Sequence, residues 1–444
     1  MKRKGLIAVN LALLEDKKVN KIYLGFREKI TTNIGKEKFA IAVSGGTDSL
    51  SLSILAKLYS LENKNKFIAL IVDHGLRKES AKEAKETLKN LLKNNINAKI
   101  LTYSGQKFSS NIQKKARDLR YDLMQNFCKK NNIKYLILAH HQEDLIENFY
   151  IRLVRGSGIK GLTSLEELTQ ALSNFYIVRP LLNFSKLDLI YITKKIYRSW
   201  IEDPSNVNDK FLRVRIRKFQ NKLKKEGFNT SRIIKTINNL NYAKKSLDFY
   251  ILKSEKKYLN FFKEGYASLN YSIFNNEAQE IIFRVFIKAL HYVSGEYYPP
   301  RSENLTKLIK NISLKQFKSA TLGGCLVEKN KNIINFFREE RNMSIVLLNK
   351  QNLKKIWDDR FVVVNKSSIK SRILVKKLGK EGLSVIKQYK FQKKIHTIPT
   401  LAIKTLPSFW NLKNELLFVP FINFTNNKLK VKKDSFDVNY LRFN

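Results

Sequence analysis

Short apolar runs alternate with longer amphipathic stretches through the first half of the chain. The runs are continuous and rich in strand-forming residues, which is typical of strands buried on both faces of a sheet. The stretches between them repeat apolar residues at helical spacing. Strands that alternate with helices indicate βαβ units, and therefore an α/β fold built on a parallel sheet. We expect strands at residues 39–43, 67–72, 98–103, 135–139 and 176–178, and helices at residues 50–58, 78–94, 109–131, 143–155 and 186–196.

The pattern changes in the second half of the chain. A helical face runs over residues 233–258, and a second helix near 277–293 is apolar on almost all sides, so we expect it to be buried. Residues 320–327 and 333–337 have the pattern of a hairpin, and the runs that follow are short, basic and rich in strand formers. We therefore expect four parts: an N-terminal extension at 1–37, an α/β domain at 38–217, a middle, mainly helical domain at 218–344 and a C-terminal α+β domain at 345–444.

The first residues superficially have the form of a signal peptide, because basic residues precede an apolar stretch. Asn10 interrupts that stretch, charged residues follow it directly, and no small-x-small cleavage site is present. We therefore expect a short helix at residues 5–14 in place of a targeting segment. No run approaches the ~20 apolar residues of a membrane span, and we expect no membrane partner.

The chain of 444 residues is strongly basic, with 84 Lys and Arg against 38 Asp and Glu and a formal net charge of +46. Such a charge indicates a polyanionic partner, and nucleic acid is the first candidate. The competing interpretation is compositional drift towards Lys, Asn and Ile, which does not easily explain the shortage of acids. The two cysteines, Cys128 and Cys325, lie far apart in apolar surroundings. They favour the reducing cytoplasm and exclude a disulfide scaffold.

A turn with two glycines joins the first predicted strand to the first predicted helix. Glycines permit positive φ and leave no side chain between the backbone and a ligand. The residues after them can cap the helix, whose first N–H groups lack partners and attract phosphate. The turn lacks the G-x-x-x-x-G-K-[ST] pattern of a Walker loop, and an ordinary strand–helix connection is the competing interpretation. The candidate phosphate-binding residues are Ser44, Gly45, Gly46, Thr47, Asp48 and Ser49.

Polar residues also follow the other predicted strands, at the edge where parallel sheets bind ligands. Asp73 and His74 follow the second strand, and His140 and His141 follow the fourth. These histidines and nearby carboxylates could form a zinc site. That interpretation is weak, because the sequence has neither an HExxH motif nor cysteines at zinc-binding spacing.

Two carboxylates, Asp144 and Glu147, stand three residues apart at the start of a predicted helix and therefore lie on one face. They could hold a metal ion, or bind and deprotonate an amine. The competing interpretation is a solvated acidic helix start, which the helix dipole favours. Arginines suited to bidentate phosphate contacts recur in three nearby stretches; they are Arg117, Arg120, Arg152, Arg155, Arg213, Arg215 and Arg217.

Seven short motifs occur in order between about residues 38 and 217. They are Ser44–Ser49; Val72–Arg77; Ala116, Arg117, Arg120 and Tyr121; Ala139–His141 with Asp144 and Glu147; Arg155–Gly158 with Gly161 and Leu162; Arg179–Leu182; and Glu202–Asn206. In type and order they resemble the motifs of the tRNA(Ile)-lysidine synthetases, a family of N-type ATP pyrophosphatases. Leu322–Cys325 and Trp357–Phe361 are similar to motifs of the family's two C-terminal domains. Val214 departs from the family pattern, which has Asn between arginines, so we do not expect the polar contact of that Asn here.

The resemblance implies a PP-loop ATP-pyrophosphatase domain followed by two smaller C-terminal domains, one mixed and mainly helical and one α+β. It implies that the protein ligates free lysine to C2 of the wobble cytidine in the CAU anticodon of tRNA(Ile). The expected cofactors are ATP and Mg²⁺, and the expected route is an adenylated tRNA intermediate with release of pyrophosphate and then AMP. The basic C-terminal domains would hold the tRNA body.

The resemblance also implies roles for the candidate residues. Asp48 would hold Mg²⁺ beside the leaving pyrophosphate, Asp144 and Glu147 would bind the lysine amine, and Arg117 and Arg213 would offset charge on the α-phosphate. The expected catalytic residues are Asp48, Asp144, Glu147, Arg117 and Arg213, and the expected ATP-binding residues are Ser44, Gly45, Gly46, Thr47, Asp48, Ser49, Asp73 and His74.

Two other interpretations stay open. One is an ATP-dependent tRNA thiolase, although such enzymes use cysteine pairs or an iron–sulfur cluster, and Cys128 and Cys325 offer neither spacing. The other is a non-catalytic basic RNA-binding protein on a degenerate ATP fold, against which the intact loop and the two carboxylates argue. The sequence does not decide between a monomer and a homodimer.

Overall fold

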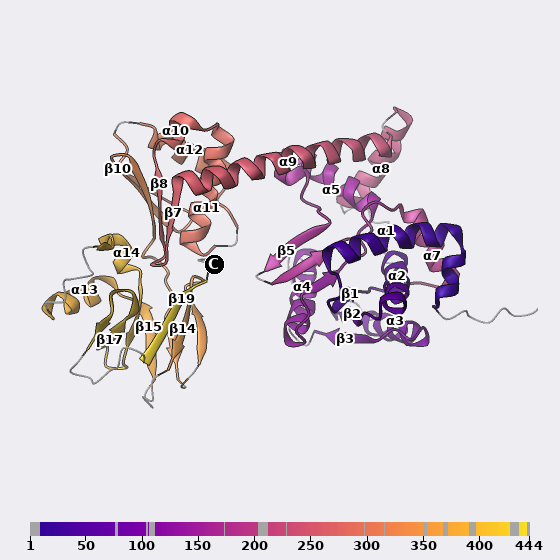
Figure 1. The fold of residues 1–444 in the computed structure, drawn as a ribbon, viewed down its shortest axis with the longest axis horizontal. Coiled ribbons are helices and arrows are strands. Elements are labelled where there is room, and N and C mark those ends of the chain that lie inside the picture. Colours follow the sequence, from indigo (N-terminus) through magenta and orange to yellow (C-terminus); the bar gives the residue numbers. More distant parts are fainter. Residues whose placement is uncertain are drawn as a thin grey trace, which may run out of the picture. The chain divides into compact units, whose positions relative to one another are not determined.

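The computed structural model shows two compact units, residues 1–244 (unit 1) and residues 245–444 (unit 2) (Figure 1). The predicted limits at 217/218 and 344/345 fall inside unit 1 and unit 2, and the four-part division stays a prediction. The motif residues Leu76, Arg77 and Asp203–Asn206 lie outside the described residues, as does the predicted helix start at 109–111. The described residues are 9–75, 79–103, 105, 112–172, 174–202, 212–227, 229–296, 298–314, 316–349, 351, 353–366, 372–389, 397–426 and 435–441.

A six-stranded sheet forms the centre of unit 1, in the order β3-β2-β1-β4-β6-β5. All neighbouring strands pair in parallel except β5 and β6, which are antiparallel. The predicted strands are all present and the α/β fold is confirmed; β5 was not predicted, because its alternation of apolar and polar residues is short. The strands are β1 Phe39–Ala42, β2 Phe67–Asp73, β3 Ala98–Thr102, β4 Tyr135–Ile137, β5 Leu168–Leu172 and β6 Phe175–Val178.

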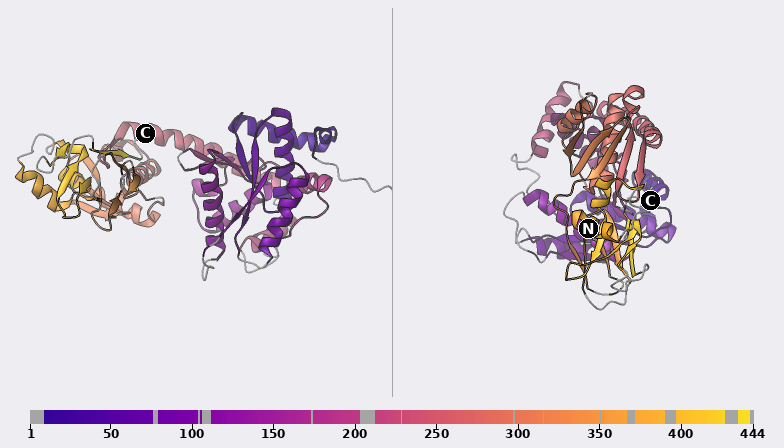
Figure 2. Two further views of the ribbon diagram at one scale, coloured as in Figure 1. Left: turned by 90° about the horizontal axis from the view of Figure 1, so that it is seen from below. Right: turned by 90° about the vertical axis from the view of Figure 1, so that its left-hand side faces the viewer.

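Helices cover both faces of this sheet (Figure 2). Phe39 and Ile41 of β1 pack on one face with α1, α2, α3 and α7, whereas Ala40 between them packs on the other face with Met124 and Cys128 of α4. Successive side chains of a strand point to opposite faces, so these strands bury both sides. This is why they form continuous apolar runs in the sequence. The helices are α1 Lys17–Asn33, α2 Thr47–Asn63, α3 Ser80–Lys93, α4 Ile112–Lys130 and α7 Lys186–Ile196.

The N-terminal region differs from the prediction. The first part of the helix predicted at residues 5–14 lies outside the described residues, which begin at Val9. From there the chain forms a short 3₁₀-helix, η1, at Leu11–Glu15, and α1 follows, which we did not predict. Asp16 separates the two and caps α1, because its carboxylate accepts hydrogen bonds from the first N–H groups of that helix. The buried face of α1 has helical spacing and consists of Val19, Ile22, Tyr23, Phe26 and Ile30.

The remaining helices of unit 1 lie beyond the sheet. Ile146 and Tyr150 of α5 pack against Ile216 of α8, and this contact brings the arginines of α8 beside the acidic face of α5. α9 begins in unit 1 and continues into unit 2. No helix in the described part of the chain, α9 included, is long and apolar enough to cross a membrane. The bounds are α5 Gln142–Val154, α6 Ile159–Leu162, α8 Leu212–Lys225 and α9 Thr230–Tyr258.

The first half of unit 2 is an antiparallel sheet of order β7-β8-β11-β10-β9 with three helices. The predicted hairpin is β10–β11, and the predicted buried helix is α11, whose Val285, Phe286, Ala289 and Val293 are fully buried. This region contains more strand than we predicted. The strands β7, β8 and β9 are short, so their patterns in the sequence are weak. The elements are β7 Leu259–Phe262, β8 Tyr266–Asn270, α10 Ile273–Asn276, α11 Gln279–Ser294, α12 Ser302–Ile312, β9 Ser319–Leu322, β10 Cys325–Asn330 and β11 Ile333–Arg338.

The second half of unit 2 contains two further sheets, of order β12-β15-β16-β17-β18 and β13-β14-β19. One hydrophobic cluster joins Phe286 and Phe336 of the first half to Trp357, Phe361 and Phe409 of the second. Residues before and after 344 therefore share a core. The elements are β12 Val346–Leu348, β13 Lys354–Trp357, β14 Phe361–Asn365, β15 Ile373–Lys377, α13 Gly379–Gln388, α14 Thr400–Lys404, β16 Pro407–Trp410, β17 Leu416–Val419, η4 Pro420–Ile422, β18 Phe424–Thr425 and β19 Phe436–Tyr440.

Candidate active site

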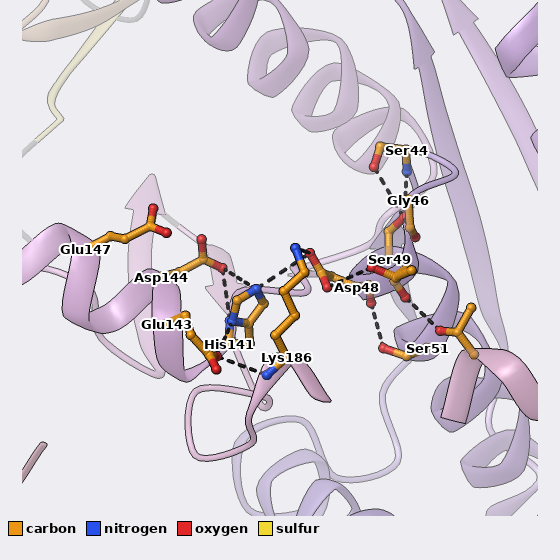
Figure 3. A network of polar contacts seen from close by, with 12 residues as sticks. Ser44, Gly46, Asp48, Ser49, Ser51, His141, Glu143, Asp144, Glu147 and Lys186 are labelled. Atoms are coloured by element: carbon orange, nitrogen blue, oxygen red, sulfur yellow. Dashed lines mark hydrogen bonds and ion pairs between the residues drawn. The ribbon is translucent and has the colours of Figure 1, made fainter. Parts of the chain in front are cut away.

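The predicted site residues gather where the strand order of unit 1 reverses. β1 lies between β2 on one side and β4 on the other. In open α/β sheets, ligands bind beyond the carboxyl ends of the strands at such a reversal point. Ser44–Ser49 form the turn after β1 and the first residues of α2, and the segment after β4 leads into α5, which carries Asp144 and Glu147 (Figure 3). Strand order thus brings the two groups of candidate residues together.

The glycine turn is closed by its own serines. The Ser49 hydroxyl donates to the Gly46 carbonyl at 3.0 Å, and the Ser44 backbone N–H donates to the Ser49 hydroxyl at 3.1 Å. The Thr193 hydroxyl, on α7, donates to the Thr47 carbonyl at 2.9 Å. These bonds hold the N-terminus of α2 against the end of β1. The first N–H groups of α2 have no partner within the helix and face the turn, as an anion-binding helix start requires.

The two glycines of the turn have different reasons to be glycine. Gly45 has φ +85°, and a Cβ there would lie 2.4 Å from the Thr87 hydroxyl and 2.6 Å from Ile201 Cδ1, so the fold itself requires it. Gly46 has φ −79°, and the nearest atom to a Cβ would be the Ile201 carbonyl oxygen at 3.6 Å. The fold would accept a side chain at Gly46. Its absence keeps the space in front of the α2 N-terminus open.

His141 connects the turn to α5 (Figure 3). Its Nε2 lies 3.6 Å from Asp48 Oδ2 and 3.5 Å from Asp144 Oδ2, and its Nδ1 lies 2.9 Å from Glu143 Oε2. Lys186 Nζ lies 4.0 Å from the same Asp48 Oδ2. One imidazole thus contacts three carboxyl groups, and two of these, on Asp48 and Asp144, are predicted site residues.

The charges of this network stabilise one another. Burial lowers the pKa of His141, but hydrogen bonds to Asp48 and Glu143 and the charge of Asp144 outweigh it and raise that pKa to about 10. Burial raises the pKa of Asp48, while the hydrogen bond and charge of His141 and the charge of Lys186 hold it below its usual value. At neutral pH an imidazolium therefore lies between the phosphate-binding turn and α5.

We considered His141 only as a member of a possible zinc site, and we assigned no role to Glu143 or Lys186. The one available signal was local: His141 is the N-cap of α5, and its backbone N–H donates to Asp144 Oδ2 at 3.1 Å, as in a capping box. The Lys186 backbone N–H donates a hydrogen bond to Glu143 Oε2 at 3.0 Å, which connects α7 to the same network. No sequence pattern indicates this contact.

Asp144 and Glu147 lie on one face of α5, as predicted, but in different environments. The Asp144 side chain is 16% exposed. The Glu147 side chain is 2% exposed; its Oε1 accepts a hydrogen bond from Arg217 on α8, and its buried Oε2 has no partner in the described part of the chain. Burial raises the pKa of Glu147, against the opposing effect of Arg217. The effect of burial outweighs that of Arg217, so the pKa of Glu147 lies above its usual value.

The two candidate arginines lie on different helices. Arg117 is exposed on α4, 5.8 Å from the Tyr121 ring centroid, and Arg213 is exposed on α8. The positive charges of both lower the pKa of His140, so both side chains lie close to this edge of the sheet. Val214, where we expected a polar residue, is buried.

Asp73 is the last residue of β2, and His74 follows it. Asp73 Oδ1 accepts hydrogen bonds from the Gly75 N–H at 3.1 Å and the Ser80 hydroxyl at 2.7 Å, and so connects the end of β2 to the start of α3. His74 is half-buried. Among the residues that the structure describes, no group of three or more His, Cys, Asp or Glu side chains is arranged to hold a metal ion.

Comparison with known proteins agrees with this geometry. Residues 18–223 match the family model of the PP-loop domain. The chain is 35% identical over 353 residues to a tRNA(Ile)-lysidine synthase of Wolbachia pipientis wMel, covering 78% of each chain. It is 31% identical over 414 residues to a tRNA(Ile)-lysidine synthase of Orientia tsutsugamushi (strain Boryong), covering 90% of this chain and 92% of that protein. The chain belongs to the tRNA(Ile)-lysidine synthase family of PP-loop enzymes.

Proposed function

We propose that this enzyme ligates lysine to C2 of the wobble cytidine in the CAU anticodon of tRNA(Ile), at the expense of ATP. The observation that carries the proposal is the meeting of a phosphate-binding turn, Ser44–Ser49, with two carboxylates suited to an amine, Asp144 and Glu147. Both groups lie at the reversal point of one sheet and are joined through His141. Family membership supports the coarser statement that the enzyme modifies tRNA by ATP-dependent ligation.

In the first step, the C2 oxygen of cytosine attacks the α-phosphorus of ATP, and the bond to the β-phosphate breaks. The N–H groups at the start of α2 and the turn would hold the departing pyrophosphate. Arg117 and Arg213 would offset the charge that gathers on the α-phosphate. Asp73 and His74, at the neighbouring strand end, would contribute to binding ATP.

Mg²⁺ fits this site as an ion that is coordinated by the phosphates of ATP. It commonly binds one or two carboxylates, with water and phosphate oxygens completing its shell. Asp48 is the suitable carboxylate: its side chain is 31% exposed and its pKa is held low, so it is an accessible anion at the mouth of the turn. Bound there, the ion would neutralise charge on the leaving pyrophosphate.

In the second step, the ε-amine of lysine attacks C2, the bond from C2 to the bridging oxygen breaks, and AMP leaves. The amine must be neutral to attack, yet its ordinary pKa is about 10.4. We propose that Asp144, the more exposed acid, binds the ammonium, and that Glu147 accepts its proton. Burial raises the pKa of Glu147, and its Oε2 has no hydrogen-bond partner among the described residues, which suits a proton acceptor.

Removing either negative charge should impair the use of lysine more than the use of ATP. Asp144→Asn should raise the KM for lysine by about 10- to 100-fold, because a hydrogen bond to a charged group contributes about 1.5–3 kcal/mol. Glu147→Gln should instead act mainly on kcat if it accepts the proton. Steady-state kinetics with each substrate varied separately tests both. Equal losses for ATP and lysine would point to a metal-binding role for the two acids.

Binding of tRNA should weaken steeply with salt. Each duplex phosphate neutralised by the protein contributes about −0.9 to the slope of log K against log salt, and each single-stranded phosphate about −0.7. With a net charge of +46, we expect several such contacts and a slope of about −5 for six of them. Selectivity for the CAU anticodon should vary less, because base contacts carry it. Filter binding from low to high salt measures both, and a slope near zero would indicate compositional drift.

The two cysteines favour lysine ligation over tRNA thiolation. Cys128 and Cys325 are both buried, and burial raises the pKa of each to about 12. A buried neutral thiol is a poor nucleophile and metal ligand. Free buried cysteines also suit the reducing cytoplasm, where we place the reaction.

The decisive experiment incubates the protein with ATP, labelled lysine and a tRNA(Ile) transcript carrying CAU. Mass spectrometry of the digested RNA should find lysine on the wobble cytidine, with one AMP formed per lysine. A transcript with uridine at the wobble position is the matched control and should stay unmodified. Sulfur in the RNA would establish the thiolase alternative, and tRNA binding without ATP cleavage would establish the non-catalytic one.

A further inference from the structure

A buried arginine holds a second histidine at the edge of the sheet where the site lies. His140 follows β4 and Arg179 follows β6, and these two strands pair in parallel, so their carboxyl ends are neighbours. Arg179 Nε donates a hydrogen bond to His140 Nδ1 at 3.1 Å. The reaction steps proposed so far use neither residue.

Arg179 is fixed from several sides. It is 7% exposed, its Nη1 donates to the Glu166 carbonyl at 2.8 Å and to the Thr169 hydroxyl at 2.8 Å, and its backbone N–H donates to the Glu167 carbonyl at 2.7 Å. These hydrogen bonds hold the Arg179 side chain in one orientation, so it cannot bind a different partner. A guanidinium also has donors only, so its role in the bond to His140 cannot reverse.

This bond determines which nitrogen of His140 carries the proton. Because Nδ1 must accept from Arg179, the neutral ring carries its proton on Nε2. Burial and the charges of Arg179, Arg117 and Arg213, against the opposing charge of Asp144, lower the pKa of His140 to about 4. The ring is therefore neutral at physiological pH. Its Nε2 has no hydrogen-bond partner in the described part of the chain and is not among the buried unpaired atoms there.

We infer that Arg179 is a positioning residue that locks His140 as the Nε2–H tautomer, and that this N–H donates a hydrogen bond to an oxygen of a nucleotide substrate. The inference rests on the proposed function, since it needs nucleotides at this edge of the sheet. During adenylation such an oxygen gains negative charge. A neutral N–H group stabilises this charge by donating a hydrogen bond, and it keeps its proton at neutral pH. The oxygen belongs to an ATP phosphate or to the cytosine base, and binding experiments distinguish the two.

Nitrogen NMR of the full chain, labelled in its histidines, tests the tautomer without any substrate. The chain has five histidines, and His140 is assigned by its loss in His140→Gln. We expect an unprotonated Nδ1 and a protonated Nε2 near neutral pH, and a mixture of tautomers in Arg179→Met. An Nδ1–H tautomer or an imidazolium in the wild-type protein would overturn the inference. A non-hydrolysable ATP analogue and a CAU anticodon stem-loop are then added in separate experiments. One of the two should shift the Nε2 signal of His140. If neither shifts it, the proposed contact with a substrate is overturned.

Two substitutions of His140 provide the functional test. Glutamine places an amide N–H near the position of Nε2, whereas asparagine can replace only Nδ1. If Nε2–H donates to a substrate in the transition state, His140→Asn should lose about 10²-fold in kcat, and His140→Gln should retain at least tenfold more activity than His140→Asn. Equal losses would overturn the donor role. Because the NMR result needs no turnover, a wild-type protein that fails to ligate lysine would refute the proposed function and leave the tautomer assignment standing.

Discussion

Replacing Asp48 by asparagine should reduce pyrophosphate release from ATP by about 10³-fold. Asp48 lies in the first turn of α2, and its Oδ1 accepts a hydrogen bond from the Thr47 hydroxyl at 3.1 Å. Asparagine preserves that bond and the shape of the side chain but removes the negative charge. A phosphate-bound Mg²⁺ would then lose its carboxylate ligand, and His141 would lose one of its three carboxyl neighbours.

Pyrophosphate release under saturating ATP and tRNA measures this effect. Glu28→Gln is the matched control, because Glu28 is exposed on α1 and a surface change of this kind alters stability by less than about 0.5 kcal/mol. Both variants should bind tRNA like the wild type, since the basic surface is unchanged. A rate for Asp48→Asn within tenfold of the control would remove this carboxylate from the reaction.

Replacing Asp358 by asparagine should destabilise unit 2 by about 3–5 kcal/mol. The Asp358 side chain is 4% exposed and pairs with two arginines, Arg338 at 3.0 Å and Arg360 at 2.7 Å. Arg360 is fully buried, and it also donates to the carbonyls of Gly265 and Thr405, which come from opposite halves of the unit. Without the carboxylate, the buried Arg360 and the half-buried Arg338 would lose the negative charge that they share.

The neighbouring residue provides the control. Asp358 has φ +52° and Asp359 has φ +51°, and asparagine tolerates this left-handed conformation, so both substitutions keep the backbone. Asp359 is exposed, and Asp359→Asn should change stability by less than about 0.5 kcal/mol. Of the three tryptophans, Trp357 and Trp410 report on unit 2, so denaturant unfolding in a Trp200→Phe background isolates its transition. Equal midpoints for the two variants would contradict the prediction.

The local pattern of the sequence predicted the catalytic half well. The run Phe67–Val72 of β2 is apolar throughout because the strand lies between helices on both faces, so the run is visible without any knowledge of its neighbours. The turn Ser44–Ser49 comes after β1, and the acids of α5 lie on the helix that follows β4. Their places at carboxyl ends, and their nearness to one another, follow from the architecture of parallel sheets.

Weaker or longer patterns were missed. α1 has a regular buried face, but it follows an apolar N-terminal stretch that drew the helix prediction towards residues 5–14. β5 pairs only at the edge of its sheet and is partly polar, so its signal is short. In unit 2 the predicted limit at 344/345 rests on a change of composition, whereas one hydrophobic cluster includes residues on both sides of it, and the limit stays a prediction.

The apolar pattern and the order of the motifs along the chain were enough to predict the α/β fold and to name candidate residues for the site. How those residues contact one another became visible only in the folded protein. His141 meets Asp48 across 93 positions of the chain, Arg217 meets Glu147 across 70, and Arg360 meets Gly265 across 95. Charge, hydrogen bonding and burial depend on distances in space, and these distances arise from the packing of several elements at once. Local spacing along the chain carries no information about them.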